Sequence, residues 1–282
     1  MLAAVLSLPE PFDTPFMQRA LLETLLLAVL GGVLGSWIVL RRLAFFTHGT
    51  GTAAFPGLVV AGPWGVPAQV AALGSGLLYA GSVERLGRRT GADAATGLLL
   101  VAALALGVVL ASDVYESGAG VDRLLFGSAL AISERDLWLT AATVAAVLGL
   151  DAVLRRAWLA GGFDPVAARS LGVPTAAADR LLLAAVAVAV VVALDAVGSL
   201  LVTAVLVIPA ATVRLVARDL RTLRLGGVAL AAAEAVAGLW LADRFNVGPG
   251  PALAVLAATV FAVVAVATRP SEAATSRLAE AE

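Results

Sequence analysis

Residues 249–267, PGPALAVLAATVFAVVAVA, form an apolar stretch without a charged side chain, and this stretch decides the fold class. A helix of about 20 apolar residues is long enough to cross the hydrocarbon core of a bilayer. Comparable stretches occur throughout the chain, at residues 20–40, 44–62, 65–83, 92–111, 137–154, 181–195, 198–216 and 226–243. The sequence therefore predicts an all-α polytopic membrane protein with eight or nine transmembrane helices.

Two regions leave the number of spans open. Residues 44–62 are rich in glycine and threonine, so we expect this span to be either intact, broken or re-entrant. Residues 181–216 fit either two spans or one long helix with a short return. The composition supports the class, because 61% of the 282 residues are hydrophobic and only 14% are charged, against about 25% in soluble domains. The absence of cysteine excludes disulfides and thiolate metal sites.

The basic residues, all of them arginine, predict how the chain is oriented. If residues 41–42 face the cytoplasm, alternating spans place all 19 basic residues on that side except Arg19, Arg123, Arg135 and Arg244. Cytoplasmic loops carry an excess of basic residues. We therefore predict an extracytoplasmic segment at residues 1–19, a transmembrane domain at 20–268 and a cytoplasmic tail at 269–282.

The longest predicted cytoplasmic loop, residues 157–180, reads AWLAGGFDPVAARSLGVPTAAADR. Asp164 is a good N-cap for a helix, and Pro165 suits the first helical position. Gly172 and Pro174 are expected to end this helix after a few residues. A short capped helix on the cytoplasmic face is a natural docking element for a soluble partner; the alternative is an ordinary amphipathic loop helix.

The sequence contains none of the common catalytic motifs. It lacks a phosphate-binding loop, an HExxH zinc motif and a nucleophile elbow. We therefore expect a chain that is not an enzyme and does not hydrolyse ATP itself. The energy for transport is then expected to come from a partner or from an ion gradient.

Several stretches, in this order along the chain, resemble the membrane permease of metal-ion ABC importers, the group that takes up zinc, manganese or iron. They are LGGVLGSWIVLRRLAFF (30–46), FPGLVVA (55–61), LLFGSALAIS (124–133), FDPVAARSLGVP (163–174), VGSLLVTAVLVIPAATVRLV (197–216) and GPGPALAV (248–255). The resemblance implies a homodimer with a central path, a cytoplasmic ATP-binding subunit that uses the ATP, and an extracytoplasmic metal-binding lipoprotein. It implies no covalently bound cofactor and no nucleic acid. The family's coupling helix corresponds to Asp164, Pro165, Ala168, Arg169 and Gly172.

His48, the only histidine, is a candidate metal ligand in the translocation path. In the family, an Asp and a His four residues apart follow the arginine pair, and the resemblance places them at His48 and Thr52. The spacing is kept while the ligand types differ, and two-fold symmetry would pair two copies of His48. The alternative is an interior histidine that bonds to Thr47, to Thr52 or to a neighbouring carbonyl.

Four other residues within apolar spans carry candidate roles. Glu234 lies near the middle of its span and is expected to be protonated, paired with an arginine or facing the path. Asp195 is either a path residue or a hydrated carboxylate near the outer end of a span. Pro209 is either a hinge or a static kink, and Asp151 is placed for an i,i+4 ion pair with Arg155.

Three other functions stay open at this point. A proton-coupled secondary transporter would use Glu234, Asp195 and His48 as a relay. An ABC permease for a metal chelate would tolerate the altered ligand pair. A membrane subunit without a transport role is the third alternative.

Overall fold

The computed structural model describes residues 10–114, 132–198 and 201–268, and all regular structure in these ranges is helical. The helices are α1 (Pro15–Leu40), α2 (Ala44–Ala53), α3 (Phe55–Ala61), α4 (Ala68–Thr90), α5 (Ala92–Val109), the π-helical turn η1 (Leu110–Val114), α7 (Glu134–Phe163), α8 (Pro165–Ser170), α9 (Thr175–Val197), α10 (Val202–Arg214), α11 (Leu220–Phe245) and α12 (Pro249–Ala267). The predicted all-α class is confirmed. The predicted tail at 269–282 and most of the stretch 124–133 lie outside the described residues.

Six helices of the described part are long and apolar enough to cross a membrane: α1, α5 with the start of η1, α7, α9, α11 and α12. This number is below the predicted eight or nine, although each predicted stretch contains a helix. Residues 44–62 are divided between α2 and α3, which have 10 and 7 residues. α10 has only 13 residues, and α4 ends in a basic turn with Arg88 and Arg89.

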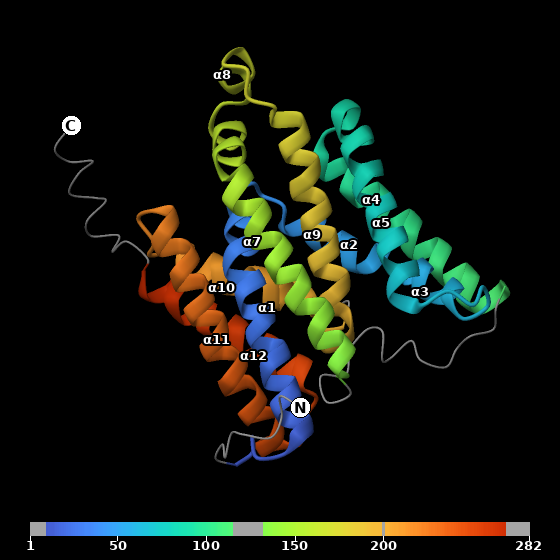
Figure 1. Ribbon diagram of the computed structural model, residues 1–282, viewed down its shortest axis with the longest axis vertical. Coiled ribbons are helices and arrows are strands. Elements are labelled where there is room, and N and C mark those ends of the chain that lie inside the picture. Colours follow the sequence, from blue (N-terminus) through green and yellow to red (C-terminus); the bar gives the residue numbers. More distant parts are fainter. Residues whose placement is uncertain (1–9, 115–131, 199–200, 269–282) are drawn as a thin grey trace.

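α1 is the central helix of the larger part of the bundle (Figure 1). It packs against α7, α10 and α11, while α12 packs against α10 and α11. Leu27, Leu34 and Trp37 of α1 are each at most 1% exposed. A helix that is apolar and buried on several faces belongs to the core of a helical membrane protein.

Glycines on α1 set its distance from α10 and α11. A Cβ atom on Gly32 would lie 2.8 Å from the Cα of Val228, and one on Gly227 would lie 3.2 Å from the Cα of Gly32. A Cβ atom on Gly35 would lie 3.0 Å from the Cβ of Ala210 on α10. Helices in membranes associate through such small residues because they let the backbones approach.

α9 connects this larger part to a smaller one that contains α2, α3, α4 and α5 (Figure 1). α7, α4 and α2 all pack against α9, and α3 packs against α4 and α5. Phe46 of α2 stacks on Tyr79 of α4 with the ring centroids 5.8 Å apart. α9 therefore packs against both groups of helices and lies between them at the centre of the molecule.

Short-range capping defines where the long helices begin and end. Ser133 and Asp136 form a reciprocal capping box at the start of α7. Asp219 accepts a hydrogen bond from the backbone N–H of Thr222 at 2.8 Å, which lowers the pKa of this carboxyl and fixes the start of α11. α11 ends at Asn246, which adopts the left-handed conformation.

Candidate functional site

The predicted short helix after Asp164 is confirmed as α8. One carboxylate oxygen of Asp164, Oδ1, accepts hydrogen bonds from the backbone N–H groups of Val166 and Ala167, both at 2.9 Å. Gly172 has a φ of +75°, and the N–H of Val173 donates to the carbonyl of Ala168 at 3.0 Å. This is the Schellman end of a helix, which requires a residue that tolerates positive φ.

α8 presents an exposed apolar surface at one extremity of the molecule (Figure 1). Phe163, Val166 and Leu171 are 88%, 76% and 81% exposed, respectively; we call these three side chains the α8 apolar triad. Ala168, by contrast, is buried at 3% exposure and attaches α8 to the bundle. Ala168, Arg169 and the capping residues were predicted from the sequence, whereas the triad was not, since its exposure depends on how α8 stands away from the bundle.

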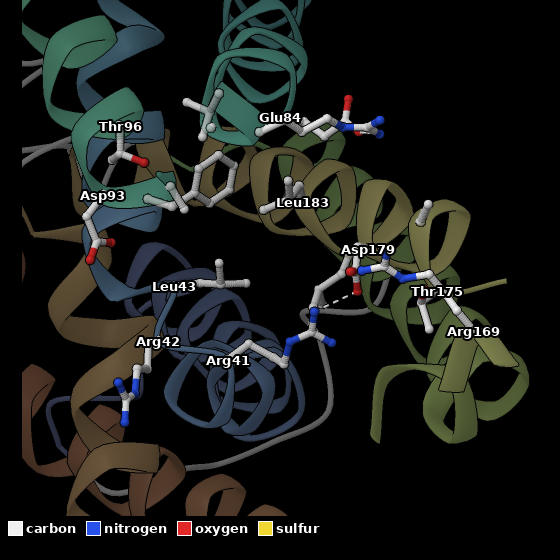
Figure 2. A pocket seen from close by; sticks show the side chains of 17 residues that line it. Arg41, Arg42, Leu43, Glu84, Asp93, Thr96, Arg169, Thr175, Asp179 and Leu183 are labelled. Carbon is white, nitrogen blue, oxygen red and sulfur yellow. Dashed lines mark hydrogen bonds and ion pairs between the residues drawn. The ribbon is translucent and has the colours of Figure 1, made fainter. Parts of the chain in front are cut away.

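A cavity of about 630 Å³ lies beside α8, between the end of α1, the start of α2, α4, α5 and α9 (Figure 2). Charged side chains of both signs line it: Arg41, Arg42, Arg88, Arg169, Glu84, Asp93 and Asp179. Arg88 forms an ion pair with Glu84, and Arg41 forms one with Asp179 at 2.7 Å. The acidic side chains thus offset much of the positive charge at this end of the molecule.

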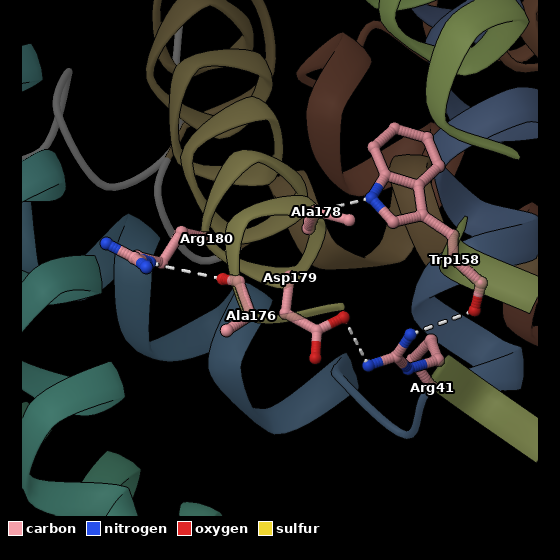
Figure 3. A network of polar contacts seen from close by, with 6 residues as sticks. All are labelled: Arg41, Trp158, Ala176, Ala178, Asp179 and Arg180. Atoms are coloured by element: carbon pink, nitrogen blue, oxygen red, sulfur yellow. Dashed lines mark hydrogen bonds and ion pairs between the residues drawn. The ribbon is translucent and has the colours of Figure 1, made fainter. Parts of the chain in front are cut away.

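Arg41, directly after α1, forms hydrogen bonds with α7 and α9, the helices before and after α8 in the chain (Figure 3). Its Nη2 donates to Asp179 Oδ1 on α9 at 2.7 Å, and its Nη1 donates to the carbonyl of Trp158 on α7 at 3.0 Å. The indole N–H of Trp158 in turn donates to the carbonyl of Ala178 at 2.7 Å. α7 and α9 are therefore joined to each other and to α1 on the bundle side of α8.

The contacts continue into the bundle through Asp151 of α7. Asp151 accepts two hydrogen bonds from Arg224 of α11, at 2.5 and 2.9 Å, and one from the indole N–H of Trp37 at 2.7 Å. The Arg224 guanidinium lies 4.9 Å from the centre of the Trp37 ring, and Trp37 packs edge-on against Trp158 at 5.4 Å. The predicted pair between Asp151 and Arg155 was wrong, because a partner far along the chain takes both carboxylate oxygens.

His48 lies on α2 and is partly buried. The hydroxyl of Thr47 donates to the carbonyl of Leu43 at 2.9 Å, and that of Thr52 donates to the backbone carbonyl of His48 at 3.4 Å. The imidazole of His48 forms no hydrogen bond with either hydroxyl among the described residues, although the alternative of an interior histidine included such bonds. No group of three or more His, Cys, Asp or Glu side chains in the described ranges is placed to hold a metal ion.

Glu234 and Asp195, the other predicted path residues, lie on α11 and α9. Glu234 on α11 is 6% exposed, and it forms no ion pair with an arginine of the described part. It lines a small cavity together with Pro209, and His48 does not line this cavity. Asp195 lies near the end of α9, and its side chain is outside the described part. Glu234 and His48, two of the three residues of the alternative relay, therefore do not line a common cavity of the described part.

These features define a polytopic helical membrane protein that carries a capped, projecting helix at one end. Residues 13–268 match the ABC 3 transport family, and the chain belongs to this family. It is thus a multi-pass protein of the cytoplasmic membrane and the permease component of a transport system.

Similar proteins agree with this assignment. The manganese transport system membrane protein MntC of Halalkalibacterium halodurans is 32% identical over 250 residues, which cover 88% of this chain and 86% of that protein. The manganese import system permease protein ScaB of Streptococcus gordonii is 30% identical over 89% of this chain and 91% of its own. The solved structure of PsaBC from Streptococcus pneumoniae in complex with Fab superposes with a TM-score of 0.78, at 29% identity, over 88% of this chain and 90% of that chain.

Proposed function

We propose that this chain is the permease subunit of an ATP-driven importer of divalent metal ions, with manganese as the first candidate substrate. The family assignment supports the importer, and the names of the MntC and ScaB relatives support manganese. The observation that carries the coupling mechanism is α8, a capped helix with an exposed apolar triad that packs against α7 and α9; these two helices are joined to each other and to α1 by Arg41 and Trp158. ATP is used by a separate ATP-binding subunit, and a metal chelate is the alternative substrate.

We infer that the α8 end faces the cytoplasm. Arg41, Arg88, Arg169 and Arg180 lie at this end, on α1, α4, α8 and α9, as the positive-inside rule expects. α1 then begins on the extracytoplasmic side, where a metal-binding lipoprotein would dock. The two copies of a homodimer would enclose the path, and movement of α8 would switch the side to which the path opens.

The α8 apolar triad supplies the contact with the ATP-binding subunit in this proposal. Leu171→Asp and Val166→Asp place a charge where an apolar surface is buried on docking, so we expect co-purification of that subunit to fall about tenfold or more. ATP hydrolysis should also become independent of metal uptake. The measurement is pull-down of the ATP-binding subunit from membranes, followed by uptake of manganese in vesicles.

Val247→Asp is the matched control for the triad, because Val247 is 50% exposed and follows α11. α11 runs antiparallel to α1, so Val247 lies at the end opposite α8. Its replacement should leave docking unchanged. Full co-purification by both triad variants would remove α8 as the docking element.

His48 is the residue that we place in the metal path, opposite its copy in the second subunit. We expect His48→Ala to lower manganese uptake about tenfold or more, since loss of even an outer partner of a metal typically has an effect of that size. His48→Asp should keep most of the uptake, because a carboxylate oxygen is also a good manganese ligand. Uptake by His48→Ala at the unmodified rate would exclude this role.

The proton-coupled alternative receives less support. Its relay needs Glu234, Asp195 and His48 within reach of one another, and Glu234 lines a small cavity that His48 does not line. The described residues therefore favour a permease that depends on a partner for energy.

A further inference from the structure

A small cavity lies between α1, α10, α11 and α12, at the proline of α10. Its volume is about 20 Å³, which suffices for one particle of the size of a water molecule. Small and apolar side chains form most of its wall: Ala28, Ala231, Ala235, Leu253 and Ala257. The remaining wall residues are Glu234, Thr24, Val205 and Pro209.

Glu234 lines this cavity without a compensating positive charge from the described residues. Its Oε1 atom is buried and has no hydrogen-bond partner there. The nearest basic residues of the same helix, Arg224 and Arg244, are each ten positions away, which is about 15 Å along a helix, and Arg221 is farther. Glu23, the other buried acid near this site, differs because it accepts a hydrogen bond from Thr140 at 2.6 Å. Since a bare buried carboxylate is strongly disfavoured, Glu234 either holds a proton or lies beside a cation.

The other polar atoms of the wall are acceptors. The hydroxyl proton of Thr24 is directed to the carbonyls of Ala20 and Leu21, at 2.9 and 3.0 Å, so its oxygen has only lone pairs left. Pro209 has no N–H, and the carbonyl of Val205 therefore lacks its usual donor one turn ahead in α10. Oxygen acceptors without donors are what a hard cation prefers as ligands.

We propose that this cavity is a binding site for one small hard cation, held by the Glu234 carboxylate, the Val205 carbonyl and the Thr24 hydroxyl oxygen. The cation joins the kinked α10 to α1 and α11 and supplies the positive charge that Glu234 lacks. Sodium and the transported divalent metal share this chemistry, and the experiment separates them. The site is independent of His48 and of the proposed path.

The test uses the full-length chain in lipid nanodiscs with His48→Ala as the background, so that the candidate path site contributes nothing. Thermal unfolding is followed while sodium chloride or manganese chloride is added, with choline chloride keeping the ionic strength constant. A cation that binds only the folded state raises the unfolding midpoint in a saturable way. In Glu234→Gln, which keeps the shape and removes the charge, the affinity should fall about tenfold or more.

Asp243→Asn is the matched control, since Asp243 is an exposed acid on the same helix. This variant should respond to the cation as the background does. Thr24→Val removes the hydroxyl oxygen, and Pro209→Ala adds an N–H that occupies the Val205 carbonyl. Each variant therefore removes one acceptor, and we expect both to weaken cation binding about threefold. These two variants test the site if Glu234→Gln does not fold.

The cation that binds is identified as the one, sodium or manganese, whose addition raises the unfolding midpoint in a saturable way. Two results would overturn the proposal: no saturable stabilisation by either cation, which would mean that Glu234 is simply protonated, or stabilisation that is undiminished in Glu234→Gln and Thr24→Val.

Discussion

Asp151→Ala is expected to lower the free energy of unfolding by about 3–5 kcal/mol, because it removes one partner of a buried ion pair and leaves the other charge unpaired. The side chains of Arg224 and Asp151 are only 15% and 11% exposed. The same change leaves the indole N–H of Trp37 without its acceptor. The measurement is reversible unfolding of the purified protein in mixed micelles, followed by tryptophan fluorescence.

The matched control for Asp151 is the exposed carboxylate Asp243, whose replacement by alanine should change the stability by no more than about 0.5 kcal/mol. The double variant Asp151→Leu with Arg224→Leu should recover much of the loss, since an apolar pair of similar volume often replaces a buried ion pair without penalty. A loss below about 1 kcal/mol in Asp151→Ala would contradict a structural role for this pair.

Gly32→Val should have the second large effect, a loss of about 3 kcal/mol of stability from overpacking. A side chain at this position meets the backbone of Val228 on α11, where the Cβ would lie 2.8 Å from a Cα atom. Backbone atoms cannot move aside as the end of a flexible side chain can, so α1 and α11 must separate. Equilibrium unfolding under the same micellar conditions measures the loss.

Gly149 of α7 provides the comparison for Gly32, because no atom lies within 4 Å of the position that its Cβ would take. Gly149→Ala should be neutral or stabilising, since alanine favours a helix by up to about 1 kcal/mol over glycine. If Gly32→Val were as stable as Gly149→Ala, the close approach of α1 and α11 would not limit packing.

Local features of the sequence predicted much of the fold. Long apolar stretches predict helices wherever they lie, and each predicted stretch contains one. Asp164, Pro165 and Gly172 act on their own neighbours along the chain, so they predicted α8 correctly. Six helices of the described part are long and apolar enough to span, somewhat fewer than the eight or nine predicted. The sequence left open that residues 44–62 are divided, as they are between α2 and α3, whereas hydropathy alone does not reveal that α10 is short.

Contacts between distant parts of the chain could not be predicted in this way. Asp151 has Arg155 one turn away, but its partner is Arg224, and only the packing of both α7 and α11 against α1 brings these two together. The α8 apolar triad depends on the direction in which α8 projects. The cavity at Glu234 depends on four helices, and the sequence could identify only its carboxylate as unusual.

The length of α7 has a mechanical consequence. Its 30 residues make a rod of about 45 Å, while the hydrocarbon layer of a bilayer is about 30 Å thick. At an ordinary tilt, part of α7 therefore extends beyond the hydrocarbon layer into the headgroup region or the water, and α8 follows the C-terminal end of α7. A force on α8 would act at one end of the long, stiff helix α7, most of which is embedded in lipid. A small change in the tilt of α7 within the membrane would therefore correspond to a larger lateral displacement of α8.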